Sequence, residues 1–383
     1  RSTKAEIFTL ALSLIPIFTN DDVIPPPSLL PNFIYAEYCN KQGCKGSENH
    51  EYPEINLIEH LRMFESFRHP LYEYKNSWEK ARTYIIDQFQ SYGLEIYKQS
   101  FRTQVTTHDN TITENPLMRT VIFQEMRQNE ALHQNTTVIF VTFDIDTRNY
   151  IPSGPGKPGS YFFIQEWLLN YLDGREFIGA FIIDSVSRFN WQNKTQNLIN
   201  GMQQVFPNAV NVIGSSGYKA NFLAVFSRPD KANQKEVERL IWTNEEVNDD
   251  KRLRMVRFIL RDGIVIPIEL ITRIKRTQVI DFWSNPKPLP ALLITDLGNS
   301  RRDFDEESCS DLCNAEDFLK IRRKEILQKL TMTLLQTAIY HQHILDGNHM
   351  HGRNSSSQVK NNVSEEKFNY ALILMLSLFL KFF

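Results

Sequence analysis

Cysteine is scarce in this chain, because 383 residues contain only four, grouped in two close pairs. Neither Cys39 with Cys44 nor Cys309 with Cys313 has the C-x-x-C spacing of common zinc sites. In an oxidising compartment such pairs close small loops, so we expect a Cys39–Cys44 disulfide and a Cys309–Cys313 disulfide. A zinc site that uses all four cysteines is the alternative.

The chain also lacks an excess of charge of either sign. Lys and Arg together number 43 against 45 for Asp and Glu, which leaves a formal net charge of −2. No global field would draw it to nucleic acid or to anionic lipid, so we expect no nucleic-acid partner. It has no Gly-x-Ser-x-Gly nucleophile motif and no internal repeat. Function must therefore come from a local site.

Long apolar runs are few, and one of them lies near the beginning of the chain. The run Ile7–Phe18 follows the basic residues Arg1 and Lys4 and precedes a polar stretch. This layout is typical of a secretory signal peptide, which we expect over residues 1–19. A buried core helix is the alternative, but Pro16 would interrupt it.

A second apolar run, Tyr370–Leu380, follows the polar spacer Gln358–Asn369 and the small residues Asn354–Ser357. Small residues, a spacer and an apolar tail are the layout of a glycosylphosphatidylinositol (GPI) attachment signal. We therefore expect a spacer and GPI-attachment signal over residues 346–383, with the lipid attached at Asn354 or Ser355. A docking helix or a short tail anchor is the alternative.

Glycosylation sequons agree with export from the cell. Four Asn-x-Ser/Thr patterns occur, at Asn135, Asn193, Asn354 and Asn362. The ends and the sequons together predict a glycoprotein of the secretory pathway. The protein would be attached to the extracellular face of the plasma membrane through a lipid anchor.

Helix and strand patterns alternate between residues 55 and 345, after an N-terminal extension over residues 20–54 that contains Cys39 and Cys44. Such alternation predicts the α/β class, with a mixed, mostly parallel central sheet flanked by helices on both faces. The predicted helices are Ile55–Phe67, Ser77–Gly93, Pro116–Asn129, Gly159–Leu172, Asn233–Trp242 and Ala315–His341. The predicted strands are Glu95–Thr103, Thr137–Phe143, Phe177–Ile183, Phe222–Phe226 and Pro290–Thr295.

A series of ordered segments carries a resemblance to a known family. They are SYGLEIYKQSF (Ser91–Phe101), TTVIFVTFDID (Thr136–Asp146), GSYFFIQEWL (Gly159–Leu168), IGAFIIDSVSRFN (Ile178–Asn190), RTQVIDFW (Arg276–Trp283) and LPALLITDLGNSR (Leu289–Arg301). Over roughly Ile55 to His341 the chain resembles the zinc exopeptidase family of aminopeptidases and glutaminyl cyclases, metallopeptidase family twenty-eight. The resemblance implies a peptidase-like domain over residues 55–345.

The same resemblance implies two zinc ions bridged by a carboxylate, with a glutamate as the general base. Asp184 keeps the position of one acidic ligand, with the family's Gln nearby at Gln196. The family's Glu-Glu pair becomes Asp146-Thr147, so Asp146 is a shortened remnant of the base, and Asp144 does not restore the spacing.

Two further ligand positions are altered. Val279 stands where the family often has a metal-binding histidine, and a valine cannot bind metal. The family's His-x-Asp strand should follow Thr103, where His108 and Asp109 are the weak candidates and a polar turn explains them equally well. The resemblance therefore implies a divergent member without most zinc ligands.

Three functions follow from these residues. The first is a pseudoenzyme without a cofactor, which binds a peptide or protein ligand. The second is an active zinc aminopeptidase whose sequence has lost the His-x-Asp segment between Thr103 and Pro116. The third is an enzyme of another type that uses Asp144, Asp146 and Asp184 as oxygen ligands for Ca²⁺ or Mg²⁺. We expect the first.

Overall fold

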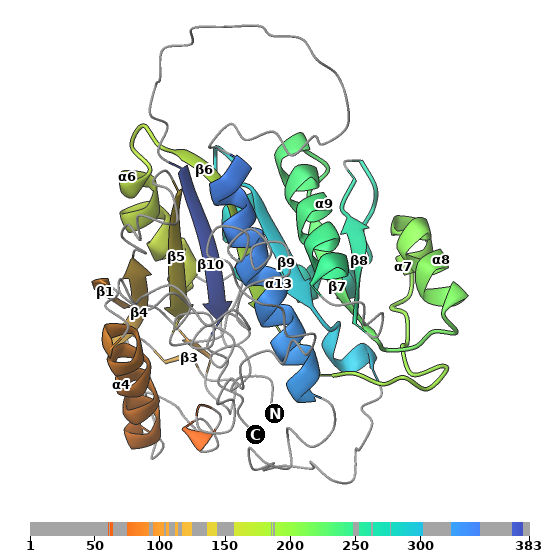
Figure 1. Ribbon diagram of the computed structural model, residues 1–383, viewed down its shortest axis with the longest axis horizontal. Coiled ribbons are helices and arrows are strands. Elements are labelled where there is room, and N and C mark those ends of the chain that lie inside the picture. The colour runs from red at the N-terminus through yellow and green to blue at the C-terminus, as the bar shows by residue number, and fades with distance from the viewer. Residues whose placement is uncertain are drawn as a thin grey trace, which may run out of the picture.

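The protein folds as a sheet with helices packed against it (Figure 1). The computed structural model describes residues 60, 62–63, 75–91, 95–102, 105–106, 112–113, 117–124, 136–143, 157–184, 186, 188–247, 253–261, 263–275, 277–301, 323–344 and 370–377. The predicted α/β class with a mixed, mostly parallel sheet is confirmed.

The main sheet has eight described strands in the order β1-β4-β5-β10-β6-β9-β7-β8. In that order they are β1 (Glu95–Arg102), β4 (Leu117–Gln124), β5 (Thr136–Phe143), β10 (Tyr370–Ser377), β6 (Glu176–Asp184), β9 (Ala291–Thr295), β7 (Phe222–Ser227) and β8 (Arg254–Ile259). A separate ribbon joins β2 (Val105–Thr106) to β3 (Ile112–Thr113).

Strand direction divides the sheet into three parts. β1, β4 and β5 are antiparallel neighbours, and β5, β10, β6 and β9 run parallel to one another. β7 is antiparallel to β9 and parallel to β8, so β6-β9-β7-β8 is a four-stranded mixed, mostly parallel unit. The carboxyl ends of the parallel strands therefore meet at one edge of the sheet.

Both faces of the sheet are buried over most of β5, β6, β7 and β9, which explains why these strands are nearly continuous apolar runs. In β5, every residue from Val138 to Phe143 is at most 1% exposed. Ile139 and Val141 belong to one core cluster with Phe163 and Ile164, which lie outside the sheet in the helical stretch after β5. Phe140, on the alternate face, packs against Phe89 with 5.9 Å between ring centroids.

Helices cover these two faces unequally. On the Phe140 face lie α4 (Lys75–Ser91), α9 (Lys231–Glu246) and α13 (Arg323–Ile344). The opposite face packs against the π-helical turn η4 (Phe163–Leu168), α6 (Leu169–Tyr171), α7 (Met202–Val205), α8 (Pro207–Ser215), α10 (Ile268–Lys275) and α11 (Val279–Trp283). The short helix α5 (Gly159–Phe162) leads directly into η4. A 3-10 turn, η5 (Gly298–Ser300), follows β9.

Capping connects α9 to the sheet. The Asp230 side chain accepts a hydrogen bond from the Asn233 backbone N–H at 3.0 Å, which satisfies one of the free donors at the helix start. The Asn233 side chain then accepts from the backbone N–H of Ala291 at 2.9 Å. The first turn of α9 is thereby fixed to the first residue of β9.

The predicted helix over Pro116–Asn129 is wrong, because residues 117–124 form β4. This strand pairs antiparallel with both β1 and β5, so that Ile122 faces Tyr97 on one side and Val141 on the other. The apolar residues of a short segment fit a helix or a strand, and pairing with distant residues decides between them.

The other predicted elements agree with the structure wherever it describes them. Predicted strands Glu95–Thr103, Thr137–Phe143, Phe177–Ile183, Phe222–Phe226 and Pro290–Thr295 correspond to β1, β5, β6, β7 and β9. Predicted helices Ser77–Gly93, Gly159–Leu172 and Asn233–Trp242 correspond to α4, to α5 with η4 and α6, and to α9. Most of the predicted helix Ile55–Phe67 lies outside the described residues. The sequence analysis did not predict β8, α7, α8, α10 and α11.

The predicted terminal segments lie largely outside the description. Residues 1–19 and 20–54, all four cysteines, and Asn135, Asn354, Ser355 and Asn362 are not described, so the predictions made for them stand as predictions. Asn193 is described and lies exposed in a loop. Among the described residues no helix has the length and apolar character needed to cross a membrane.

Candidate functional site

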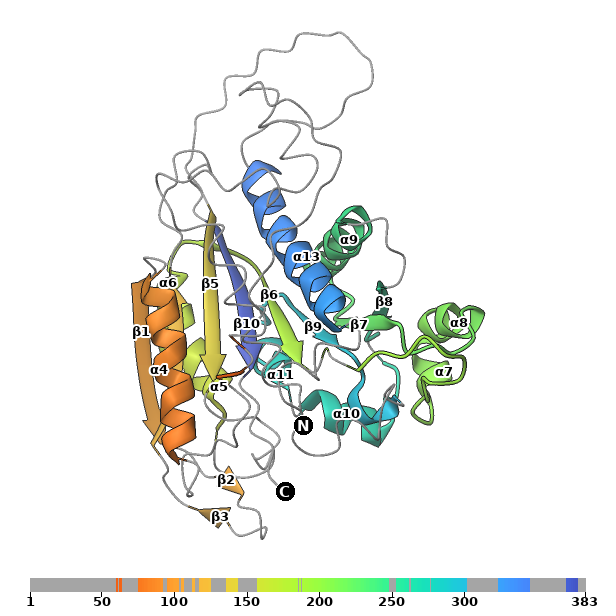
Figure 2. The ribbon, with the colours of Figure 1, turned by 60° about the horizontal axis from the view of Figure 1, so that its bottom comes forward.

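The candidate site is the edge of the sheet where the parallel strands end. β5 ends at Phe143, β6 at Asp184 and β9 at Thr295, and Asp184 and Thr295 are paired in register. Figure 2 shows α5 and α11 close to this edge. Open α/β sheets commonly bind their ligands outside the carboxyl ends of such strands.

Asp184 is the predicted ligand that the structure places at this edge. It is the last residue of β6 and is 9% exposed. His108, Asp109, Asp144, Asp146 and Thr147 lie outside the described residues, so the structure does not place them relative to Asp184.

Val279 lies in the apolar core, where the resemblance would place a metal ligand. It is the first residue of α11, is fully buried, and belongs to the same cluster as Ile139 and Val141. The preceding Gln278 is 1% exposed, and neither polar atom of its amide has a hydrogen-bond partner among the described residues. The start of α11 therefore offers a hydrocarbon side chain and a neutral amide.

These residues do not fit the two-zinc centre that the resemblance implies. Such a centre needs several nitrogen and oxygen ligands close together. In the part of the chain that the structure describes, no group of three or more His, Cys, Asp or Glu residues could hold a metal ion. Of the ligand positions assigned by the resemblance and described, Asp184 has the right chemistry and Val279 does not.

A serine–carboxylate pair that was not predicted joins α5 to α11. The Ser160 hydroxyl donates to Oδ2 of Asp281 at 2.5 Å, and Ser160 is fully buried. Burial raises the pKa of Asp281 to about 6, against the opposing effects of the Ser160 hydrogen bond and the positive charge of Lys157. Asp281 lies within the segment RTQVIDFW, but nothing in the sequence indicated that Ser160, 121 positions earlier, would contact it.

A second polar network follows the carboxyl ends of β6 and β9. The Asp296 carboxylate accepts from the backbone N–H groups of Arg188 at 2.8 Å and Gly298 at 2.7 Å. Burial raises the pKa of Asp296, and the charge of Arg301 opposes that rise. Burial also lowers the pKa of Arg301 to about 10, so its guanidinium stays protonated at neutral pH.

Arg301 joins the loops after β6 and β9 to the start of β7. Its guanidinium donates to the Gln196 side chain at 2.7 Å, the Arg188 carbonyl at 2.8 Å and the Phe222 carbonyl at 2.5 Å. It also stacks over the Phe222 ring, with Cζ 4.5 Å from the centroid. Gln196, which the resemblance placed near Asp184, is thus a partner of Arg301. This network positions loops and leaves few of its own groups for a ligand.

Comparisons with known proteins add no relative. No protein-family model, no curated protein and no solved structure matches the chain. The class that the fold and the edge define is an α/β protein with a mixed sheet whose parallel strands end beside a cluster of polar side chains.

Proposed function

We propose that the chain is a catalytically inactive relative of the zinc exopeptidases and that it binds a peptide or protein ligand at the carboxyl edge of its sheet. The observation that carries the proposal is Val279. Val279 is 0% exposed and packed in the core. Because the core is close-packed, a small rotation of α11 could not put a metal-binding side chain in its place. Ligand binding at this edge needs no metal.

The polar groups at the edge support binding better than hydrolysis. A metallopeptidase needs an acidified water and a nearby base. Two described carboxyls near the edge already accept hydrogen bonds from the protein. Asp281 accepts from the Ser160 hydroxyl, and Asp296 accepts from two backbone N–H groups. Export through the secretory pathway, with glycans on residues such as the exposed Asn193, is part of the proposal.

Catalysis can be tested directly on the purified protein. We expect no hydrolysis of a panel of fluorogenic aminoacyl and peptide substrates above the rate without protein, with or without added zinc. An Asp184→Ala variant should give the same background rate, because no catalytic centre is lost. Zinc-dependent hydrolysis that a chelator stops and Asp184→Ala abolishes would establish the active aminopeptidase instead.

A further inference from the structure

The segment Tyr370–Ser377 lies in the middle of the sheet. The sequence analysis predicted that this segment is part of a GPI-attachment signal, which would be removed when the lipid is attached. As β10 it runs between β5 and β6 and parallel to both (Figure 2). Eight of its residues pair with β5, from Tyr370 opposite Thr136 to Ser377 opposite Phe143. Seven pair with β6, from Tyr370 opposite Glu176 to Leu376 opposite Ile183.

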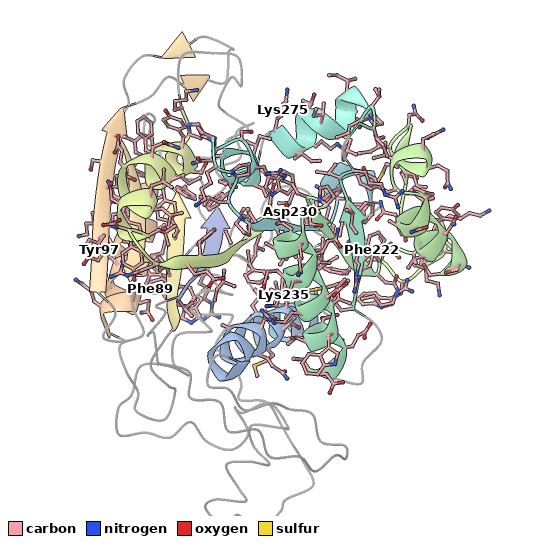
Figure 3. All side chains as sticks on the ribbon, turned by 90° about the horizontal axis from the view of Figure 1, so that it is seen from above. Phe89, Tyr97, Phe222, Asp230, Lys235 and Lys275 are labelled. Carbon is pink, nitrogen blue, oxygen red and sulfur yellow. The ribbon has the colours of Figure 1, made fainter. Side chains whose placement is uncertain are left out.

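β10 is the sole described connection between two parts of the sheet. β5 pairs otherwise only with β4, and β6 otherwise only with β9, so without β10 the described strands would form β1-β4-β5 and β6-β9-β7-β8. Figure 3 shows Phe89 and Tyr97 on one side of β10 and Phe222 on the other.

The slot between β5 and β6 requires a strand. The residues along it are buried, with Val138–Phe143 and Ala180–Ile183 at most 1% exposed. Backbone N–H and C=O groups in such surroundings need hydrogen-bond partners, and water cannot reach a buried strand edge in the middle of a sheet. An empty slot would leave one edge of each neighbouring strand without partners.

The composition of the segment meets that requirement. A parallel strand covered on both faces is expected to be a nearly continuous apolar run without polar alternation. Tyr370–Ser377 reads Tyr-Ala-Leu-Ile-Leu-Met-Leu-Ser, with no charge, proline or glycine, and it has the same eight-residue length as β5. The same apolar sequence is therefore typical both of a GPI tail and of a central strand.

We propose that the slot between β5 and β6 is a binding site for an extended apolar segment in parallel orientation, and that its occupant is the chain's own Tyr370–Ser377. The segment is then a structural strand of the mature protein. It cannot also be discarded when a lipid is attached at Asn354 or Ser355, so the two roles exclude each other. The proposal does not depend on whether the carboxyl edge is catalytic.

Hydrogen exchange on the full-length protein tests the slot. Backbone amides of residues 370–377 should be protected to the same degree as those of residues 138–143 and 180–183. Exchange of 370–377 within seconds, while both neighbours stay protected, would show that the segment is outside the sheet and would overturn the proposal.

A pair of proline variants gives a matched comparison. Leu374→Pro should accelerate exchange in β5 and β6 roughly 100-fold, because proline removes a ladder donor and distorts the strand. Leu380→Pro changes the same residue type three positions beyond the last paired residue and should leave both strands protected. Equal behaviour of the two variants would contradict the proposal, whereas failure of Leu374→Pro alone to fold would agree with it.

Mass spectrometry of protein made by secreting cells tests retention. Peptides that contain residues 370–377 should be present, and phosphatidylinositol-specific phospholipase C should release no protein from the cells. A glycolipid on Asn354 or Ser355, with residues 370–377 missing, would overturn the proposal and establish the lipid anchor.

Discussion

Replacing Arg301 by Met is expected to lower the free energy of unfolding by about 3–5 kcal/mol, the usual effect of removing one partner of a buried ionic group. Arg301 is 4% exposed and Asp296 is fully buried, so the variant removes the cation with the larger effect on the Asp296 carboxyl and leaves Arg188 alone to offset its burial. The carbonyls of Arg188 and Phe222 lose their guanidinium donor as well. Urea unfolding, followed by circular dichroism, measures the change.

Two variants separate this effect from a general loss of charge. Arg301→Lys keeps the charge but not the planar set of donors, so its loss of stability should be intermediate. Arg257→Met removes an exposed arginine whose contact with Glu238 is 3.5 Å long, and it should cost less than about 1 kcal/mol. If Arg301→Met and Arg257→Met destabilised the protein equally, the assigned role of the buried network would be wrong.

Replacing Asp281 by Asn is expected to stabilise the protein above pH 6 and to remove part of its pH dependence. The pKa of Asp281 is raised in the folded state, from 3.8 to about 6. The stability that this group contributes is therefore fully present below the unfolded value and is lost as pH rises through about 6. The wild type should lose on the order of 3 kcal/mol relative to Asp281→Asn between pH 3.5 and pH 7.5.

Ser160→Ala provides the companion measurement for this prediction. The Ser160 hydrogen bond lowers the Asp281 pKa, so its removal should move the pH-dependent loss of stability to a higher pH. Urea unfolding at half-unit pH intervals would follow the wild type and both variants. Parallel stability curves for the wild type and Asp281→Asn across this range would contradict the assignment of Asp281 as the titrating group.

The buried parallel strands were the most predictable part of the fold. β5, β6 and β9 are short apolar runs with β-branched residues between turn signals. Such a local pattern is enough to predict a strand. β4 and β10 were not predicted as strands, because each depends on partners far along the chain. From sequence alone, Leu117–Gln124 fits a helix as well as a strand, and its pairing with β1 and β5 decides for a strand. The apolar segment Tyr370–Ser377 fits a processing signal, and only the structure shows its pairing with β5.

The candidate site was predictable in the same uneven way. Asp184 was expected at the end of a strand and is there, because a strand end follows from the local pattern. The Ser160–Asp281 contact was missed because its two residues are 121 positions apart. Asp296 and Arg301 are close in the sequence, but the Gln196, Arg188 and Phe222 partners of Arg301 are far along the chain, so the network could not be predicted. The polar groups of the edge could therefore be found only from the fold.

Zinc content tests the central claim of an inactive exopeptidase relative most directly. The full-length protein, equilibrated with zinc at neutral pH and freed of unbound metal, would be measured by elemental analysis beside Asp184→Ala. We expect no stoichiometric zinc in either protein, because Val279 is a buried hydrocarbon side chain and no group of three or more His, Cys, Asp or Glu residues among those described could hold a metal ion. About two zinc ions per chain, the number in a dinuclear catalytic centre, lost in Asp184→Ala, would contradict it.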